Sequence, residues 1–378
     1  MLETRLIAGA MSGTSADGVD VAIVRIEGRG QNMAAQLVHW HHRAYPGGLR
    51  QAIYEIRLGT PTPLSILAGV GRELTLAHAA AVNEALVAAH LSSDRLAAVA
   101  AHGQTLYHDP PDTIQWLDPA LLAAEVGAVV VSDFRRADCA VGGQGAPLVP
   151  LADFILLRHS QKNRVLLNIG GIANITYLRA GAKLDDLIAF DTGPGNCISD
   201  HLSRQFDPHG PGWDVEGHLA SRGVPIYPLV QQVLADPYFA KSPPKSTDGP
   251  AMVERFTDAL TEIGRKFPLE NLLRSACLIS ADTILAAIRQ FCKPFPDEII
   301  ISGGGTKNLT LMSLLRQPLG EVPIRSSEEV GIPSAAKEAM AFALLGAATL
   351  DGIPGNVPAA TGARRAVVLG SITPWRSA

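Results

Sequence analysis

The sequence predicts an α/β protein built from two domains. Its 378 residues exceed what one hydrophobic core usually serves, so two domains are expected. Each half carries an apolar strand, a small-residue loop and a second apolar strand, at residues 6–26 and 165–178. In addition, Asp191 follows a short apolar strand and precedes a glycine turn, the position at which open α/β sheets bind ligands. These observations predict a duplicated architecture with a cleft between its halves.

Composition narrows the class of protein. With 47% hydrophobic and 18% charged residues the chain is expected to fold as a globular protein. A net charge of -4 and 5% aromatic residues give no reason to expect nucleic acid or an anionic membrane as a partner. The four cysteines lack the spacing typical of zinc ligands. The N-terminus shows no signal-peptide pattern, and the apolar run 339–350 is too short to span a bilayer. We therefore expect a cytoplasmic protein.

The first half alternates strands and helices. A long helix is expected over 62–91, where apolar residues recur at helical spacing. A second is expected over 118–126, with Asp118 as N-cap and Pro119 at its first position. The strands expected in this half are 6–11, 19–26, 36–45, 96–101 and 129–131.

The second half repeats the pattern around a long insertion. Residues 207–245 are rich in Pro, Gly and polar side chains, so we expect a mobile or substrate-facing segment. The strands expected are 165–169, 172–178, 187–190, 298–302 and, last, 365–369. The helices expected are 148–157, 196–206, 251–267, 271–291, one ending at 315, and 334–350.

The domain boundary is placed near Asp133–Arg136, where a strand ends. Domain I is expected to comprise 1–134 plus a returning C-terminal segment, 358–378. Domain II is expected to comprise 135–357.

Asp191 is the candidate catalytic residue. It stands in Phe190-Asp-Thr-Gly-Pro-Gly-Asn196, between the strand and a helix. The alternative is a carboxylate that caps the following helix, which the residues alone leave open.

Three glycine-containing junctions could hold phosphate, at 9–18, 170–171 and 303–308. Glycine lets backbone N–H groups turn towards an anion. None of these junctions matches a Walker A loop or a dinucleotide fingerprint, so an NAD enzyme is disfavoured. Together with Asp191 they favour a nucleotide-binding cleft.

Six motifs in order resemble the anhydro-N-acetylmuramic acid kinase family, over nearly the whole chain. They are Met11-Ser-Gly-Thr-Ser-Ala-Asp-Gly-Val-Asp20, Ala101-His-Gly-Gln-Thr105, Asp133-Phe-Arg135 with Gly142-Gly-Gln-Gly-Ala-Pro147, Asn168-Ile-Gly-Gly-Ile-Ala-Asn-Ile-Thr176, Phe190-Asp-Thr-Gly-Pro-Gly-Asn196 and Ser302-Gly-Gly-Gly-Thr-Lys-Asn308. The resemblance implies the two-domain actin/hexokinase-like ATPase fold, with a ribonuclease-H-like core in each domain and ATP and sugar in the interdomain cleft.

The activity implied by the resemblance is ATP-dependent conversion of 1,6-anhydro-N-acetylmuramic acid to N-acetylmuramic acid 6-phosphate, in cell-wall recycling. Asp191 would then activate the water that attacks C1. The resemblance implies ATP contacts at Gly13, Thr14, Ser15, Ala16, Asp17, Gly18, Val19, Asp20, Asn168, Gly170, Gly171, Gly193, Gly303, Gly304, Gly305 and Asn308. It implies sugar contacts at His102, Asp133, Arg135, Gly143, Asn174, Thr192 and Glu338.

Three of these roles have structural alternatives. Glu338 either holds Mg²⁺ or pairs with a helix dipole. Arg135 either binds the lactyl carboxylate or forms a salt bridge with Asp133 or Asp138. His102 either contacts sugar or is a satisfied histidine at a strand end.

Two rival functions remain. One is a kinase for another anhydrosugar, such as levoglucosan. The other is a non-enzymatic actin-like protein, against which Asp191 in its full motif argues. The partners expected are ATP and the anhydro-muramyl sugar, with a homodimer left open.

Overall fold

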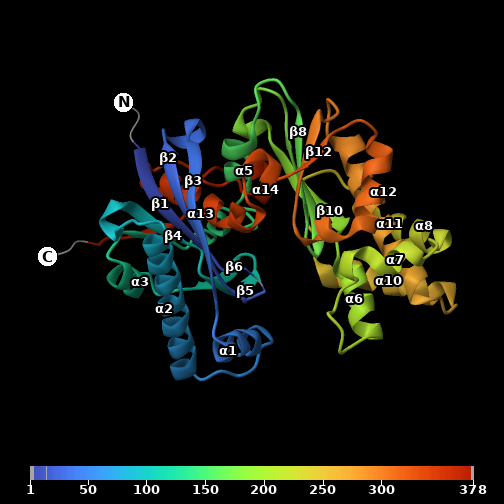
Figure 1. The fold of residues 1–378 in the computed structure, drawn as a ribbon, viewed down its shortest axis with the longest axis horizontal. Helices are drawn as coiled ribbons and strands as arrows, with labels where there is room; N and C mark the ends of the chain where they lie inside the picture. The colour runs from blue at the N-terminus through green and yellow to red at the C-terminus, as the bar shows by residue number, and fades with distance from the viewer. Residues whose placement is uncertain (1–3, 14, 376–378) are drawn as a thin grey trace. The chain divides into compact units, whose positions relative to one another are not determined.

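The computed structural model describes residues 4–13 and 15–375. The chain forms two compact units. Unit 1 comprises Met1–Leu157 and Ile332–Ala378, and unit 2 comprises Arg158–Gly331. The expected boundaries, at 134/135 and 357/358, differ from this division. The helix α13 (Ser334–Leu350) explains the difference, because it packs on the first strands of unit 1 (Figure 1).

Unit 1 is built on a six-stranded sheet of order β13-β7-β4-β1-β2-β3. Strands β1, β2 and β3 form an antiparallel meander. Strand β4 pairs in parallel with β1, β7 pairs in parallel with β4, and β13 pairs antiparallel with β7 at the edge of the sheet. The bounds are β1 Thr4–Met11, β2 Gly18–Glu27, β3 Ala34–Ala44, β4 Leu96–Ala101, β7 Val130–Ser132 and β13 Ser371–Thr373.

Unit 2 repeats this path in a five-stranded sheet of order β10-β9-β8-β11-β12. Strands β8, β9 and β10 form an antiparallel meander. On the other edge of β8, β11 pairs in parallel with β8, and β12 pairs in parallel with β11. The bounds are β8 Arg164–Ile169, β9 Ile172–Leu178, β10 Ile188–Pro194, β11 Glu298–Ser302 and β12 Ile324–Ser326. Two copies of this ribonuclease-H-like order define the actin/hexokinase-like fold class, so that prediction is confirmed.

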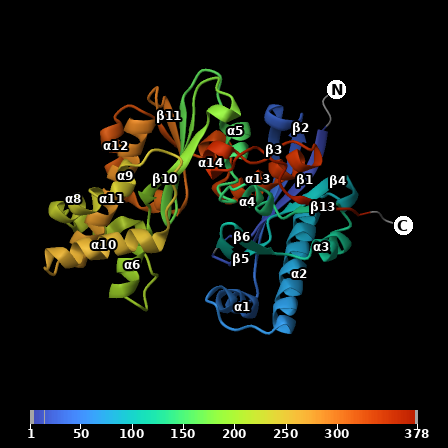
Figure 2. The same ribbon diagram turned by 180° about the vertical axis from the view of Figure 1, so that it is seen from behind.

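Helices cover both sheets. In unit 1 they are α1 Gly47–Arg57, α2 Leu64–Ala88, α3 Pro119–Val126, α4 Arg136–Ala140, α5 Pro150–Leu157, α13 and α14 Pro358–Thr361, beside the hairpin of β5 (Gln104–Asp109) and β6 (Asp112–Trp116). In unit 2 they are α6 Cys197–Phe206, α7 His218–Arg222, α8 Tyr227–Leu234, α9 Pro237–Ala240, α10 Gly249–Ile263, α11 Leu269–Phe291 and α12 Leu309–Leu319 (Figure 2). Short 3-10 turns occur at Gly30–Asn32, Ser93–Arg95, Leu184–Asp186, Val215–Gly217, Gly304–Lys307 and Glu328–Val330.

Strand β1 shows how unit 1 is layered. Ala8 and Ala10 are buried in the cluster that contains α2 residues such as Leu74. Gly9 points to the other face, where a methyl group at its Cα would lie 1.9 Å from the Ala339 carbonyl of α13. The small residues of β1 therefore let a helix approach the sheet closely, as the contact of α13 with β1 in Figure 1 illustrates.

Helix α11 is the central helix of unit 2. By length and composition it is apolar enough to cross a membrane. However, 67% of its most apolar window is buried inside the protein, among strand and helix side chains of the same core. It is therefore a core helix.

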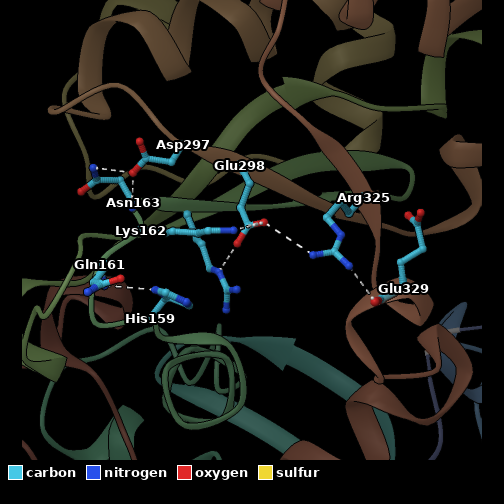
Figure 3. A network of polar contacts seen from close by, with 9 residues as sticks. His159, Gln161, Lys162, Asn163, Asp297, Glu298, Arg325 and Glu329 are labelled. Carbon is cyan, nitrogen blue, oxygen red and sulfur yellow. Dashed lines mark hydrogen bonds and ion pairs between the residues drawn. The ribbon is translucent and has the colours of Figure 1, made fainter.

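A buried carboxylate fixes the starts of three strands in unit 2 (Figure 3). Glu298 on β11 lies 2.6 Å from Arg164 Nε on β8 and 3.4 Å from Lys162 Nζ. Arg325 Nη1 on β12 lies 3.8 Å away. Although burial opposes ionisation, Arg164 and Lys162 outweigh it and lower the pKa of Glu298. This network ties β8, β11 and β12 together at the end opposite their glycine loops.

Most predicted elements are confirmed, with two corrections. Strand β10 does not end at Phe190: it continues through Pro194, paired with β9 across an irregularity between Asp191 and Gly193. The predicted last strand, 365–369, is wrong. Its backbone instead bonds the preceding loop, through Val367 N to Asn356 Oδ1 and Gly355 N to Val367 O, and the final strand is β13.

Candidate active site

Four polar residues form a row across the sheet of unit 2. Ser302 pairs with Asn168, Asn168 with Asn174, and Asn174 with Asp191, on four neighbouring strands. Because directly opposed residues point to the same face of a sheet, the four side chains share one face. The Ser302 hydroxyl donates to Asn168 Oδ1 at 3.3 Å. The row gathers three separate sequence motifs around the candidate base.

Asp191 is held from both sides. Its backbone N–H donates to the Lys245 carbonyl at 3.1 Å, and its own carbonyl accepts from the Tyr238 hydroxyl at 2.8 Å. The carboxylate Oδ2 accepts from Thr247 N–H at 3.0 Å. Burial raises the pKa of Asp191 to about 6, against the lowering effect of the Thr247 hydrogen bond. A carboxylate with this pKa is ionised at neutral pH and still basic enough to accept a proton.

The alternative role of Asp191, as cap of the next helix, is not what the structure shows. The carboxylate binds Thr247, which precedes α10 by two residues, and the first amides of α6 bind elsewhere. Asn196 N and Cys197 N donate to the carbonyls of Gly170 and Gly171. The helix start is therefore joined to the glycine turn between β8 and β9.

Glycines of unit 2 fall into two groups. Gly303 and Gly305 pack against Ile169, where a methyl group would lie 2.5 Å from its carbonyl and 2.2 Å from its side chain, so the fold itself requires them. By contrast, a methyl group at Gly171 or Gly304 would have no atom of the described residues within 4 Å, apart from those of its immediate chain neighbours. These open glycines leave backbone accessible to a ligand, which fits the expected nucleotide contacts.

The first loop of unit 1 is tied to the second motif. Ser12 Oγ, which is buried, lies 2.8 Å from the Gly18 carbonyl and 2.7 Å from Gln104 Oε1. Gln104 Nε2 donates to the Gly13 carbonyl at 3.1 Å. Ala16 has a φ of +44°, a conformation uncommon for alanine. The loop is thus fixed at both ends, while the expected contact Thr14 lies outside the described residues.

Arg135 and His102 form a pair behind this loop. Arg135 Nε donates to His102 Nε2 at 3.0 Å, and Nη1 donates to the Gly145 carbonyl at 2.7 Å. His102 Nδ1 lies 2.9 Å from the Gly103 carbonyl, so the neutral ring donates there and accepts from Arg135. Burial, and then the Arg135 charge, lower the pKa of His102 well below its usual value. Both ring nitrogens are therefore occupied, as the satisfied-histidine alternative expects.

Within the described chain, Arg135 forms no ion pair with Asp133 or Asp138. Asp133, with a φ of +62°, pairs with Arg136 at 2.8 Å. Burial lowers the pKa of Arg135, and the charges of Glu338 on α13 and of Cys139 oppose that shift. The guanidinium thus keeps donor groups beyond those that bind His102 and Gly145.

Asp20 and Glu338 bring two carboxyl groups into the same region of unit 1. Burial raises the pKa of Asp20, although His42 Nδ1, 3.0 Å from Oδ1, lowers it. Glu338 as a whole residue is exposed, but desolvation of its carboxyl group raises its pKa. The charges of Lys337 and Arg135 lower that pKa, and the charge of Asp20 raises it further. Among residues 4–13 and 15–375, no group of three or more His, Cys, Asp or Glu side chains could hold a metal ion.

Several expected contacts have internal partners. The buried Thr192 hydroxyl donates to the Ala173 carbonyl at 3.1 Å. Asn308 caps α12 by accepting from Leu311 N. A methyl group at Gly143 would lie 2.1 Å from Asp138, and one at Gly18 would lie 2.2 Å from the Arg43 carbonyl. Gly193 packs against Phe239 and Thr283.

The sequence reasoning missed two supports of the site. Asp138, fully buried, accepts from Gly145 N, Asn356 Nδ2 and Thr361 Oγ1, and so fixes the loop whose carbonyl binds Arg135. The segment 245–247 binds Asp191 although it is more than fifty residues away. Apart from the Gly145 contact, these hydrogen bonds join residues far apart in sequence, so no local pattern points to them.

A duplicated ribonuclease-H-like fold, with glycine loops at the strand ends and a half-buried carboxylate of raised pKa at Asp191, is typical of ATP-using phosphotransferases of the actin/hexokinase-like class. Comparison with known proteins gives the family. The family model described as anhydro-N-acetylmuramic acid kinase matches residues 5–375. The chain belongs to this family, whose members are ATP-dependent sugar kinases of cell-wall recycling.

Curated relatives agree over their full length. A protein of Bacillus cereus named anhydro-N-acetylmuramic acid kinase is 38% identical over 97% of this chain and 98% of its own. One of Gloeobacter violaceus with the same name is 38% identical over 99% and 100%. A solved structure, the Acidaminococcus fermentans (R)-2-hydroxyglutaryl-CoA dehydratase component A, is only loosely similar, with a TM-score of 0.41, 13% identity and coverage of 90% of this chain and 96% of that one.

Proposed function

We propose that this chain hydrolyses the 1,6-anhydro ring of 1,6-anhydro-N-acetylmuramic acid and phosphorylates O6, giving N-acetylmuramic acid 6-phosphate. Family membership supports the substrate and the use of ATP. The observation that carries the chemistry is Asp191, a carboxylate with a pKa of about 6 at one end of the polar row Ser302, Asn168 and Asn174.

The proposed reaction begins at Asp191. The carboxylate takes a proton from water as the water oxygen bonds to C1, and the C1–O6 bond breaks. O6 then bonds to the γ-phosphorus of ATP while the bond to the ADP oxygen breaks. One anhydro sugar, one water and one ATP therefore yield one sugar phosphate, one ADP and one proton, which Asp191 releases to solvent after the reaction. Because O6 is captured as it departs, no free alkoxide accumulates.

The other proposed contacts follow from their positions. The backbone of the loop that contains Gly13 would bind phosphates, and the open glycines Gly171 and Gly304 would lie against the nucleotide. Arg135, which keeps free donors, would bind the lactyl carboxylate, with His102 orienting it.

Mg²⁺ fits the acidic residues of unit 1. One or two carboxylates together with phosphate oxygens are its usual ligands, and the Asp20 charge is near enough to Glu338 to raise its pKa. When bound there, Mg²⁺ would neutralise charge on the phosphates. We also propose a cytoplasmic location, where ATP is supplied. Light scattering would distinguish a monomer of 39.9 kDa from a homodimer.

The test is a product assay with ATP, Mg²⁺ and the anhydro-muramyl sugar, with levoglucosan as comparator. We expect equal amounts of ADP and N-acetylmuramic acid 6-phosphate. Asp191→Asn should fold and bind ATP but lose about 10²–10⁴-fold in kcat, the usual contribution of a positioned base. Faster turnover of levoglucosan, or near-normal turnover by the variant, would contradict the proposal.

A further inference from the structure

Lys245 occupies an unusual position for a lysine in unit 2. Its ammonium lies over three aromatic rings, at 4.9 Å from the ring centroid of Tyr238 and 5.6 Å from those of Phe190 and Phe291. It also donates to two backbone carbonyls, those of Tyr238 at 3.2 Å and Phe239 at 3.0 Å. The cation is therefore enclosed by rings and by the carbonyls of the short helix α9.

The surroundings of this ammonium make its charge costly. Burial, and then the charge of Lys241, lower the pKa of Lys245. In the part of the chain that the structure describes, no carboxylate forms an ion pair with it. Rings and carbonyls replace the water that the cation has lost, through cation–π attraction and charge-assisted hydrogen bonds. The residue is half-buried, so this cost is modest, but a methionine would fill the same space without it and the charge still needs an explanation.

The explanation lies in the contacts that the neighbourhood of Lys245 makes with Asp191. The Lys245 carbonyl accepts from Asp191 N–H at 3.1 Å, and two residues later Thr247 N–H donates to Asp191 Oδ2 at 3.0 Å. Phe190, one wall of the cage, directly precedes Asp191 on β10. Tyr238, a second wall, donates its hydroxyl to the Asp191 carbonyl. The same residues that enclose the ammonium therefore surround the base.

We propose that Lys245 is a positioning residue for the reaction: its caged ammonium fixes the segment 245–247 against β10, so that Thr247 N–H stays on the Asp191 carboxylate. The inference rests on the proposed role of Asp191. Lys245 touches no reacting atom; it acts through the Thr247 hydrogen bond, which stabilises the ionised base.

Other titratable groups lie on the elements packed around Asp191. Among them are Tyr238 on α9, Arg255 on α10, Asp282 on α11, and Lys241, Lys245 and Asp248 in the connecting segment. Arg255 is paired with Asp236 and lies over the Tyr238 ring. Burial raises the pKa of Asp191 and the Thr247 hydrogen bond lowers it, so loss of that hydrogen bond with burial unchanged should raise the pKa.

The experiment is the pH profile of kcat/KM for the anhydro-muramyl sugar, whose acid limb reports the base in the free enzyme. The wild-type midpoint should lie near 6. Lys245→Met should raise it by about 0.5–1 pH unit, because a lost hydrogen bond to the charged form raises a carboxyl pKa. Lys245→Arg, which keeps the cation, should return it towards the wild-type value. The matched control is Lys241→Met, an exposed lysine of the same segment, which should leave the profile unchanged.

Phe291→Leu gives a second reading that spares both Lys245 and the segment. Removing one ring of the cage should raise the midpoint by a smaller amount in the same direction, and this variant decides the matter if Lys245→Met does not fold. A wild-type midpoint in folded Lys245→Met would overturn the inference. If Lys245→Met does not fold, a wild-type midpoint in Phe291→Leu would overturn it. Turnover by Asp191→Asn separates failure of the proposed base from failure of the role of Lys245. If Asp191→Asn stays active, the proposed base is wrong. If Asp191→Asn is inactive while the Lys245 and Phe291 variants keep the wild-type midpoint, only the role of Lys245 is refuted.

Discussion

At the scale of single residues, burial makes Asp191, the proposed base, more basic and also lowers the stability of the protein at neutral pH. Burial favours its neutral form, and its pKa of about 6 lies above the 3.8 of an exposed aspartate. Between these two values the folded protein binds a proton that the unfolded chain does not. The contribution of Asp191 to stability is therefore greatest below pH 3.8 and is lost as the pH rises through about 6.

The first prediction concerns the stability of Asp191→Asn. Asn is nearly isosteric and can still accept from Thr247 N–H, but it avoids the buried charge. At pH 8 the free energy of unfolding of the variant should be about 1–2 kcal/mol higher than that of the wild type. This figure is smaller than the full cost of raising the pKa from 3.8 to about 6, because Asp191 is partly exposed and solvent screens its charge. Urea denaturation at pH 4, 6 and 8 measures it. The gain should shrink towards pH 4, and a gain independent of pH would argue against a perturbed carboxyl.

Arg135 carries the second prediction. Its guanidinium is oriented by His102 and the Gly145 carbonyl and meets no aspartate of its own loop. Arg135→Ala should therefore lower kcat/KM at least tenfold more for the muramyl substrate than for an anhydrosugar lacking the lactyl group, since a charge-assisted bidentate pair is lost. Steady-state kinetics on both sugars test this. Equal losses would show a role in folding or in ATP binding instead.

Residue roles were only partly predictable from the sequence. Asp191, Asn168 and Asn174 could be selected because motifs and strand ends are local signals. The supports Asp138, Tyr238 and Lys245 could not, because each acts through a contact with a residue distant in sequence: Asp138 with Asn356, and Tyr238 and Lys245 with Asp191. The alternatives for Arg135 and His102 likewise depended on which side chains the fold brings together.

At the scale of elements, the glycine loops divide into positions that the fold needs and positions that it leaves open. Gly9 has an α13 carbonyl where a methyl group would go, whereas the nearest atom to a methyl group at Gly13 is Ser15 Oγ at 3.8 Å. Both glycines belong to the same strand–loop unit. The contrast separates a packing role from an exposed backbone that a ligand can approach.

The third prediction uses this pair. Gly13→Ala should keep the wild-type melting temperature but weaken binding of a non-hydrolysable ATP analogue about tenfold or more, because the methyl group hinders close approach to phosphate. Gly9→Ala should instead lose about 1–3 kcal/mol of stability by overpacking against α13. Calorimetric titration and thermal melts measure the two effects. Unchanged affinity in Gly13→Ala would remove this loop from the phosphate site.

Element prediction succeeded where periodicity was long and failed at short or unusual segments. Helix α2 and strands β1, β2, β8 and β9 follow apolar patterns. Strand β10 runs on through Thr192, Gly193 and Pro194, residues that usually signal a turn, because pairing with β9 overrides local preference. Strand β12 has only three residues and depends on its parallel neighbour β11, so its own sequence carries little signal.

At the scale of the whole molecule, the same strand order occurs twice. The strand pairing places Asp191, Asn174, Asn168 and Ser302 in one row in unit 2, while unit 1 carries the first loop, Arg135 and Glu338. The duplication was predictable from two strand–loop–strand units. The division of residues between the units was not, because α13 joins unit 1 through the close packing at Gly9.

The central claim is that one reaction joins ring hydrolysis by an Asp191-activated water to phosphorylation of O6. Turnover in ¹⁸O-water, with mass spectrometry of the fragmented sugar phosphate, tests it most directly. We predict one ¹⁸O atom at the C1 hydroxyl and none in the phosphate, because O6 of the sugar, not water, attacks phosphorus. Label in the phosphate, or none at C1, would contradict the claim.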